Sequence, residues 1–298
     1  MSDPPSATPA AGLASRIPPS WLVLIGIASV QIGAAVAKDL FATVPPTTMV
    51  WLRLATSAIV LLILIRPRLT GRTRRDWLVA LGYGVALVWM NWAIYQSFAR
   101  LPLGVAVTIE FLGPLVLAVI GSRRLRDVLW VLLAGAGVAL LGLEPVGLDP
   151  VGVAYALLAG AGWAAYIMLS ARTGRHWQGL SGLAVASVVG AVVLAAPAIV
   201  EAGPVLLQPR VLLLGALAGL MSSVIPYSLE LVALRRLPAK VFSILMSLEP
   251  AAAALAAMVL LQELLSVRQW VAIALVVAAS VGATRSNRRA RPAVEPLP

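Results

Sequence analysis

The sequence has no cysteine, one histidine and few charged residues for a chain of 298 residues. Without cysteine, disulfides, thiolate nucleophiles and cysteine-bound metal sites are excluded. A single histidine, His176, excludes an HExxH zinc site and argues against a Ser-His-Asp triad, since it falls in an arginine-rich loop. The only lysines, Lys38 and Lys240, both follow alanine, so the Gly-Lys-Ser/Thr loop of an ATP-driven pump is absent.

Charged residues make up 12% of the chain and hydrophobic residues 60%. A soluble domain carries about a quarter charged residues, and a chain this apolar would expose large hydrophobic patches in water. The net charge of +11 comes mostly from arginines in short clusters between apolar runs. That pattern is typical of membrane topology rather than of nucleic-acid binding, so we expect an integral protein of the lipid bilayer with no nucleic-acid partner.

Ten apolar stretches are long enough to be membrane helices. They cover residues 20–38, 47–65, 76–99, 103–121, 127–142, 150–171, 178–200, 210–233, 239–261 and 268–284. The expected fold is therefore an all-α polytopic membrane protein. Ten spans place 18 Lys and Arg residues on the side of both termini and only Lys38, Arg100, Arg210 and Arg268 on the other. The positive-inside rule then predicts a multi-pass protein of the cell inner membrane with both termini in the cytoplasm.

The two ends of the chain differ in composition from the spans. Residues 1–19 are rich in proline and alanine and residues 285–298 are basic, so both are expected to be disordered cytoplasmic segments. Residues 21–37 have an alternative interpretation as a secretory signal, with Ala35-Val36-Ala37 as a cleavage site. Their length and the single arginine before them favour a first membrane helix.

An internal repeat divides the chain into two halves. Arg100-Leu101-Pro102 recurs 136 residues later as Arg236-Leu237-Pro238, and a second proline, Pro114 or Pro250, follows twelve residues after the first in each copy. Residues 20–142 and 150–284 then hold five spans each. When a repeat unit has an odd number of spans, its second copy has the opposite orientation in the membrane, as in secondary transporters built from inverted repeats.

Three runs carry a resemblance to a known family: Ile225-Pro226-Tyr227-Ser228-Leu229-Glu230, Ala233-Leu234-Arg235-Arg236-Leu237-Pro238-Ala239 and Met246-Ser247-Leu248-Glu249-Pro250. Together with Arg53 in the second span and Glu263 after Glu249, they resemble the threonine/homoserine exporters. Those exporters belong to the EamA branch of the drug/metabolite transporter superfamily. The resemblance implies a ten-helix carrier without a cofactor, driven by an ion gradient or by substrate exchange. It also implies a small-molecule substrate, with an amino acid favoured.

Charges inside a bilayer are costly, by at least about 2.5–3.5 kcal/mol at a helix centre, so each needs a reason. Arg53 and Glu110 lie at similar depths in spans that begin on the same side, which predicts an ion pair facing a cavity. Arg53 would then also hold a substrate carboxylate. The alternative for Arg53 is snorkelling to the headgroups.

Glu249 lies near the middle of the ninth span, directly before Pro250. Pro250 frees the carbonyl of Met246, as Pro114 frees that of Glu110, and such interruptions in corresponding spans indicate a transport site. We expect Glu249 to take up a proton or to bind the substrate ammonium. The alternative is a protonated glutamate hydrogen-bonded between helices.

Two polar stripes at helical spacing are expected to form the walls of one pocket. Ser223, Tyr227 and Glu230 form the first, with Pro226 as a weaker candidate helix break, and Asn91 and Tyr95 form the second. Glu230 has an alternative role in pairing with Arg235 or Arg236. Three tryptophans away from span ends, Trp89, Trp92 and Trp163, line the pathway or simply pack.

Small residues four apart occur in the last span of each half, as Gly135 with Ala139 and Ala278 with Gly282. They predict a close helix contact, either within the chain or in a homodimer. For the cargo we favour threonine, homoserine or a related neutral amino acid, exported by alternating access with proton coupling. Nucleobases, drugs and organic cations on the same scaffold stay open. An intramembrane carboxylate enzyme is a remote alternative, and a channel is disfavoured because no ring of carbonyls or charges repeats.

Overall fold

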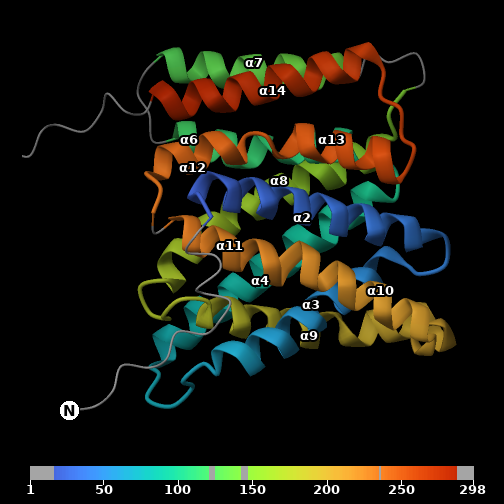
Figure 1. Cartoon of the computed structure of the whole chain (residues 1–298), viewed down its shortest axis with the longest axis vertical. Helices are drawn as coiled ribbons and strands as arrows, with labels where there is room; N and C mark the ends of the chain where they lie inside the picture. Colours follow the sequence, from blue (N-terminus) through green and yellow to red (C-terminus); the bar gives the residue numbers. More distant parts are fainter. Residues whose placement is uncertain (1–16, 121–124, 142–146, 235, 287–298) are drawn as a thin grey trace, which may run out of the picture.

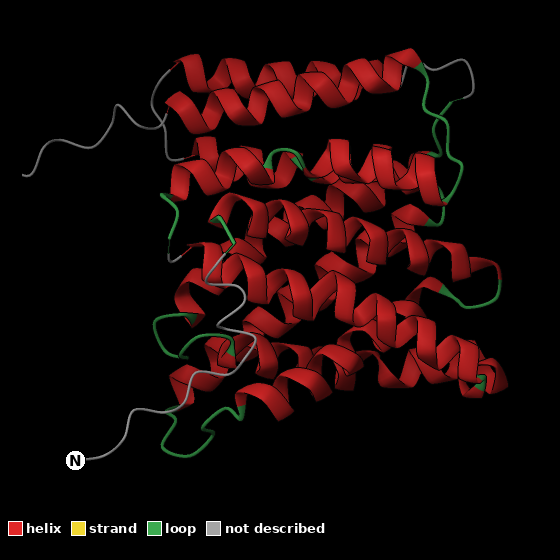
Figure 2. Cartoon of the chain, in the orientation of Figure 1, coloured by secondary structure: helices red, strands yellow, loops and turns green. Residues whose placement is uncertain are grey.

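The computed structural model describes residues 17–120, 125–141, 147–234 and 236–286, and throughout these ranges the regular structure is helical (Figure 2). The residues before 17 and after 286 lie outside the described residues. Arg123 and Arg124, which are predicted on the side of both termini, also lie outside them. The helices of the first half are α2 Pro19–Asp39, the short η1 Leu40–Ala42, α3 Pro46–Ile65, α4 Arg74–Phe98, α5 Leu103–Glu110, α6 Leu112–Ile120 and α7 Leu125–Leu141.

The second half holds a similar series. Its helices are α8 Pro150–Thr173, α9 Ser181–Ala202, the short η2 Gly203–Leu207, α10 Pro209–Gly219, the π-turn η3 Leu220–Val224, α11 Ile225–Leu234, α12 Ala239–Met246, α13 Glu249–Leu260 and α14 Val267–Ser286. Within the described ranges, nine helical segments are long and apolar enough to cross a membrane, and the shorter apolar Val128–Leu141 lies in α7. The predicted all-α polytopic membrane fold is confirmed.

Most helices begin where the sequence supplies proline or a side-chain cap. Pro19, Pro46 and Pro150 each stand in the first turn of a helix, where the missing N–H costs nothing. The start of α4 carries a capping box, in which Thr73 accepts from the backbone N–H of Asp76 and the Asp76 side chain accepts from that of Thr73. The punctuation between the apolar runs therefore sets the helix boundaries.

Contacts at the helix ends fix the relative direction of α4 and α8. Arg100, just after α4, pairs with Asp149 at the start of α8, and His176, after the end of α8, pairs with Asp76 in the first turn of α4. Helix α8 therefore runs opposite to α4. In Figure 1 the loops after α2 and α13 lie at one end of the helices, and the loops after α3 and α8 lie at the other.

Two spans predicted as single helices, 103–121 and 239–261, are each broken in two. Helices α5 and α12 have bounds exactly 136 residues apart, and each begins after an Arg-Leu-Pro proline with nearly the same backbone angles, φ −55° and ψ 139° at Pro102 and φ −56° and ψ 135° at Pro238. They also end alike, at Phe111 (φ −63°, ψ −14°) and Ser247 (φ −62°, ψ −13°). Pro114 and Pro250 follow three residues later in each case, so the missing donor explains both breaks.

The small residues of the last spans do not behave alike. Helices α7 and α14 pack side by side (Figure 1), and a Cβ added at Gly282 would lie 2.6 Å from the ring of Trp130. Gly282 is therefore used for a contact within the chain. Gly135 has open space around its Cβ position, so it makes no close helix contact within the described part of the chain, and a contact in a homodimer stays a prediction.

Candidate functional site

A central cavity of about 150 Å³ lies between the two halves and collects most of the predicted polar residues. The first half contributes Arg53 from α3, Asn91 from α4 and Glu110 from α5. The second half contributes Tyr227 and Glu230 from α11 and Glu249 from α13. Residues far apart in the sequence therefore converge on one space inside the bundle.

Arg53 is buried and held by the second half of the chain. Its Nε donates to Ser223 Oγ at 3.0 Å and its Nη2 donates to the Ser222 carbonyl at 2.8 Å. The guanidinium carbon lies 5.8 Å from the ring centroid of Tyr95. The predicted ion pair with Glu110 is therefore wrong for this state: both residues line the cavity, but Arg53 donates to two residues of the π-turn η3.

Pro226 explains why the Ser222 carbonyl is open to Arg53. In a regular helix the N–H of residue 226 would bond to the carbonyl of residue 222, and proline has no N–H. The chain forms the π-turn Leu220–Val224 at this point, and π-turns free backbone carbonyls. Arg53 supplies the missing donor, so the weaker candidate Pro226 acts on the site through the backbone and does not line the cavity.

Three carboxyl groups face the same cavity. Glu110 ends α5 and Glu249 begins α13, so each stands at a helix break, while Glu230 projects from α11. Among the described residues, none of the three accepts a hydrogen bond or joins an ion pair within 4.0 Å. With one guanidinium against three carboxyl groups, the cavity holds excess negative charge unless protons or a cationic group of the cargo balance it.

The second polar stripe is only partly in the cavity. Asn91 lines it, while its Nδ2 donates to the Leu87 carbonyl of its own helix at 2.7 Å. Tyr95 is fully buried behind Arg53, and its hydroxyl has no hydrogen-bond partner. Tyr95 is thus not a wall of the cavity but packs under the guanidinium.

The predicted tryptophans and prolines separate into distinct groups. Trp163 lines the cavity. Trp89 is 45% exposed, and the Nε1 of Trp92 donates to Thr47 Oγ1 at a distance of 3.3 Å. Neither Trp89 nor Trp92 lines the central cavity. Pro114 lines a neighbouring apolar pocket of about 610 Å³, and Pro250 is buried at the start of α13.

Sequence reasoning missed several residues of the cavity, of which Gln31 and Tyr166 are the most informative. Gln31 is a long polar residue in the middle of the largely apolar helix α2, and its Oε1 is buried without a hydrogen-bond partner. Tyr166 of α8 lies 6.4 Å from Tyr227, ring to ring. A long amide side chain in the middle of an apolar span is a signal that would have identified Gln31.

At one end of the helices, Lys38 and Glu263 join the two halves of the chain. Lys38 Nζ lies 2.5 Å from Glu263 Oε1 and donates to the Leu101 carbonyl at 2.6 Å. Glu263 Oε2 accepts from the backbone N–H of Leu103 at 2.8 Å. We call this group the Lys38–Glu263 latch; it joins α2 and the α4–α5 corner of the first half to the α13–α14 loop of the second.

Toward the opposite end the cavity adjoins a second pocket, of about 270 Å³. Tyr166, Tyr227 and Glu230 line both spaces, and the second pocket extends to Trp177 and Gly179 in the loop after α8. Glu230 therefore stands where the two spaces meet. No group of three or more His, Cys, Asp and Glu residues that could hold a metal ion occurs in the described part of the chain.

Comparisons with known proteins agree with this arrangement. The EamA-like transporter family matches residues 18–144 and 150–285. The Threonine/homoserine exporter RhtA of Salmonella typhimurium strain LT2 is 40% identical over 278 residues, which cover 91% of this chain and 94% of that protein. The Threonine/homoserine exporter RhtA of Escherichia coli strain K12 is 39% identical over the same length and coverage.

Among solved structures, one crystal structure superposes with a TM-score of 0.64 at 21% identity and covers 92% of this chain and 99% of its own. At this identity the likeness speaks for the fold alone.

Proposed function

This chain belongs to the EamA-like transporter family, and from this premise we propose that it exports a small neutral amino acid, threonine or homoserine, by proton-coupled alternating access. The family is one of transporters and not of enzymes, so the alternative of an intramembrane carboxylate enzyme is set aside. The proposal concerns the cargo, the coupling ion and the cycle.

The observation that carries the proposal is the presence of opposite charges in one buried cavity. A zwitterionic amino acid needs an anionic partner for its ammonium and a cationic partner for its carboxylate. Glu249 and Glu110 supply carboxyl groups and Arg53 supplies the guanidinium, and all three line the cavity. The unpartnered Oε1 of Gln31 adds an acceptor suited to a side-chain hydroxyl.

The size of the cavity also favours a small cargo. Pockets for drug-sized ligands measure about 300–1,000 Å³. The central cavity measures about 150 Å³, which suits a molecule with few heavy atoms. Larger drugs would require the cavity to expand.

Proton coupling follows from the charge balance of the three carboxyl groups. Arg53 balances one of them, and a bound zwitterion adds no net charge. A proton on Glu249, at the matched helix break, would balance another, and its release on the side of lower proton concentration would drive the cycle. We assign the proton to Glu249 rather than to Glu110 because Glu110 and Arg53 belong to the same half of the chain.

For the cycle we propose that the two halves, residues 20–142 and 150–284, are an inverted repeat that rocks around the cavity. The matched breaks of α5 and α12 and the opposite courses of the corresponding helices α2 and α8 (Figure 1) support this proposal. The Lys38–Glu263 latch would close the outer end, and the pocket beyond Glu230 would lead to the cytoplasm. Both termini are then cytoplasmic, in the inner membrane.

Flux measurements in proteoliposomes test the proposal directly. Labelled threonine and homoserine are followed under an imposed pH gradient for the wild type, for Glu249→Gln and for Glu201→Gln, the last as a matched control because Glu201 is exposed at the end of α9. We expect saturable flux that the gradient stimulates, lost in Glu249→Gln and kept in Glu201→Gln.

Two results would contradict parts of the proposal separately. Flux of neither amino acid from folded protein would remove the cargo assignment and direct the search to nucleobases and organic cations. Flux that is unaffected by the gradient, in a protein where Glu249→Gln behaves as wild type, would remove proton coupling while leaving the exporter in place.

A further inference from the structure

A polar pocket of about 450 Å³ lies beside the loop between α3 and α4, at the end of the helices away from the latch. Its lining includes three arginines, Arg66, Arg68 and Arg72, together with hydroxyl and amide groups from Thr70, Gln178 and Ser181. No carboxylate lines it, and it shares no residue with the central cavity. The transport cycle does not use this pocket.

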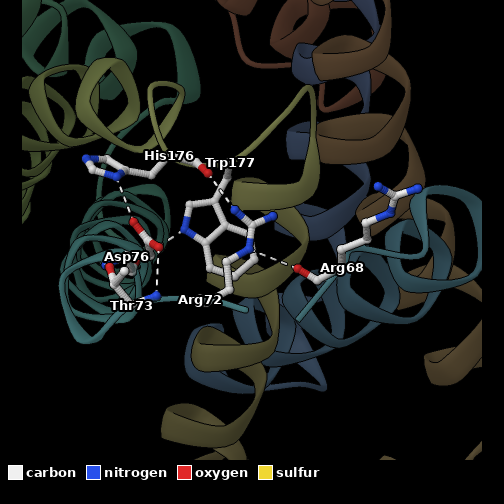
Figure 3. Close-up of polar contacts among 6 residues, drawn as sticks. All are labelled: Arg68, Arg72, Thr73, Asp76, His176 and Trp177. Carbon is white, nitrogen blue, oxygen red and sulfur yellow. Dashed lines mark hydrogen bonds and ion pairs between the residues drawn. The ribbon is translucent and has the colours of Figure 1, made fainter. Parts of the chain in front are cut away.

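Arg72 is fixed against the second half of the chain. Its Nε donates to the Arg68 carbonyl at 3.0 Å, its Nη1 donates to the His176 carbonyl at 2.7 Å, and its guanidinium carbon lies 4.3 Å from the ring centroid of Trp177. Figure 3 shows the guanidinium lying over the tryptophan ring. These contacts hold the loop between α3 and α4 in one conformation.

The nearby carboxylate is already engaged. Asp76 pairs with His176 Nδ1 at 2.7 Å and accepts from the Thr73 N–H at 2.9 Å (Figure 3). It therefore leaves the charges of Arg66 and Arg68 unbalanced. Both of these side chains are exposed, and neither has a hydrogen-bond or ion-pair partner among the described residues. In Figure 3 the Arg68 guanidinium points away from Arg72.

The backbone conformation of Arg66 is a second indication that this residue has a functional role. Arg66 ends α3 in the left-handed conformation, with φ 47° and ψ 63°, a position where glycine is the usual residue. A side chain in this region costs conformational energy, and such residues cluster at functional positions. An arginine occupies this position although a glycine would adopt the left-handed conformation at a lower conformational energy.

An apolar strip on α3 immediately precedes Ile65, which lines the pocket. Ile59, Ile63 and Leu64 are 59%, 63% and 66% exposed, and Ile59 and Ile63 are one helical turn apart on the same face. In a membrane protein this strip faces acyl chains. Unbalanced arginines at the end of a lipid-facing strip match the two parts of a phospholipid, a charged headgroup and a chain.

We propose that the pocket at Arg66, Arg68 and Arg72 binds the phosphate headgroup of an anionic phospholipid whose acyl chain lies along Ile59 and Ile63. Guanidinium groups bind phosphate oxygens with paired N–H donors, and basic pockets between membrane helices recognise anionic headgroups. The apolar strip selects a lipid over a soluble phosphate. The proposal does not depend on the identity of the cargo.

Native mass spectrometry of the full-length chain tests this site with phosphatidylglycerol, with phosphatidylethanolamine and with inorganic phosphate as separate probes. The variant is Arg66→Gln/Arg68→Gln. The matched control is Arg74→Gln/Arg75→Gln, which removes two exposed charges from the start of α4 without touching the pocket. Circular dichroism verifies the fold of each variant, and Arg68→Gln alone serves if the double variant does not fold.

We expect the wild type and the control to retain phosphatidylglycerol in preference to phosphatidylethanolamine. Each basic residue near a membrane surface contributes about fivefold in affinity for anionic lipid, so the double variant should lose on the order of tenfold or more. Equal loss in the control, or no preference between the two lipids in the wild type, would overturn the site. Displacement of the lipid by inorganic phosphate would overturn the assignment to a lipid.

Discussion

Lys38 and Glu263 form an ion pair of 2.5 Å that bridges the two halves of the chain at one end of the helices. Each partner makes a further bond to the α4–α5 corner, Lys38 to the Leu101 carbonyl and Glu263 to the Leu103 N–H. Both side chains are mostly shielded, with 16% and 20% exposed. The contact therefore joins three segments that must separate if this end opens.

Glu263→Gln is expected to open the latched end more often. Glutamine keeps an acceptor for the Leu103 N–H but loses the charge that attracts Lys38. A change of about 1 kcal/mol in the balance between states raises the open population about fivefold. The measurement is the rate at which an impermeant maleimide, added outside, labels Ala34→Cys in the cavity, in a chain that has no other cysteine.

Glu201→Gln in the same Ala34→Cys background is the control, because Glu201 is exposed and takes no part in the latch. Labelling that is equally slow in Glu263→Gln would mean that other contacts keep this end closed.

Arg53→Lys is expected to weaken cargo binding more than turnover. Lysine keeps the charge but cannot donate at once to Ser223 Oγ and the Ser222 carbonyl, which Arg53 holds at 3.0 and 2.8 Å. Losing one hydrogen bond to a charged group lowers the free energy of unfolding by about 1.5–3 kcal/mol. Flux kinetics should show KM raised at least fivefold, and thermal unfolding should show a lower Tm. Arg210→Lys, at an exposed position on α10, should leave both unchanged.

Pro250→Ala is expected to impair transport without destabilising the protein. Alanine restores a donor for the Met246 carbonyl and favours a continuous helix through the break that presents Glu249. We expect flux to fall at least tenfold while Tm stays equal or rises. Pro197→Ala is the control, since Pro197 is an exposed proline inside α9. Unimpaired flux in Pro250→Ala would show that the break is not needed.

Gly113→Ala is expected to disrupt the contact between α6 and α8. A Cβ at Gly113 would lie within bonding range of the Gly160 carbonyl oxygen, and one at Gly160 would lie 2.6 Å from the Glu110 carbonyl oxygen. Overpacking of this kind costs about 1–3 kcal/mol or more. Thermal unfolding in detergent should show a clearly lower Tm. Gly135→Ala, with open space at its Cβ position, should keep or raise the Tm; a similar fall in both would contradict the argument.

The spans and the location of the site could be predicted from the sequence because each rests on local chemistry. Apolar length gave the helices, and the cost of buried charge singled out Arg53, Glu110, Glu230 and Glu249, all of which line the cavity. The proline at 226 also carried the information that residue 222 would lose its helical donor. The sequence did not show which group would take that place, because Arg53 lies 169 residues away in the other half of the chain.

Pairing across the bundle was beyond the sequence because it depends on how helices rotate about their axes. Equal depth in the membrane suggested Arg53 with Glu110, but depth says nothing of which face of α3 meets α5. Tyr95 illustrates the same limit, since helical spacing placed it beside Asn91 while the structure buries it behind Arg53. The latch joins Lys38 and Glu263 across 225 residues of sequence, and no local pattern connects them.

The matching ends of α5 and α12 have a consequence for the energy difference between the two end states. If both halves break their helices in the same way, the free energy of the helical scaffold is nearly the same whichever end is open. The preference for one state then rests on contacts without a counterpart, such as Lys38 with Glu263. Small changes at such asymmetric positions would reset which side a resting carrier faces, while leaving its capacity to move cargo intact.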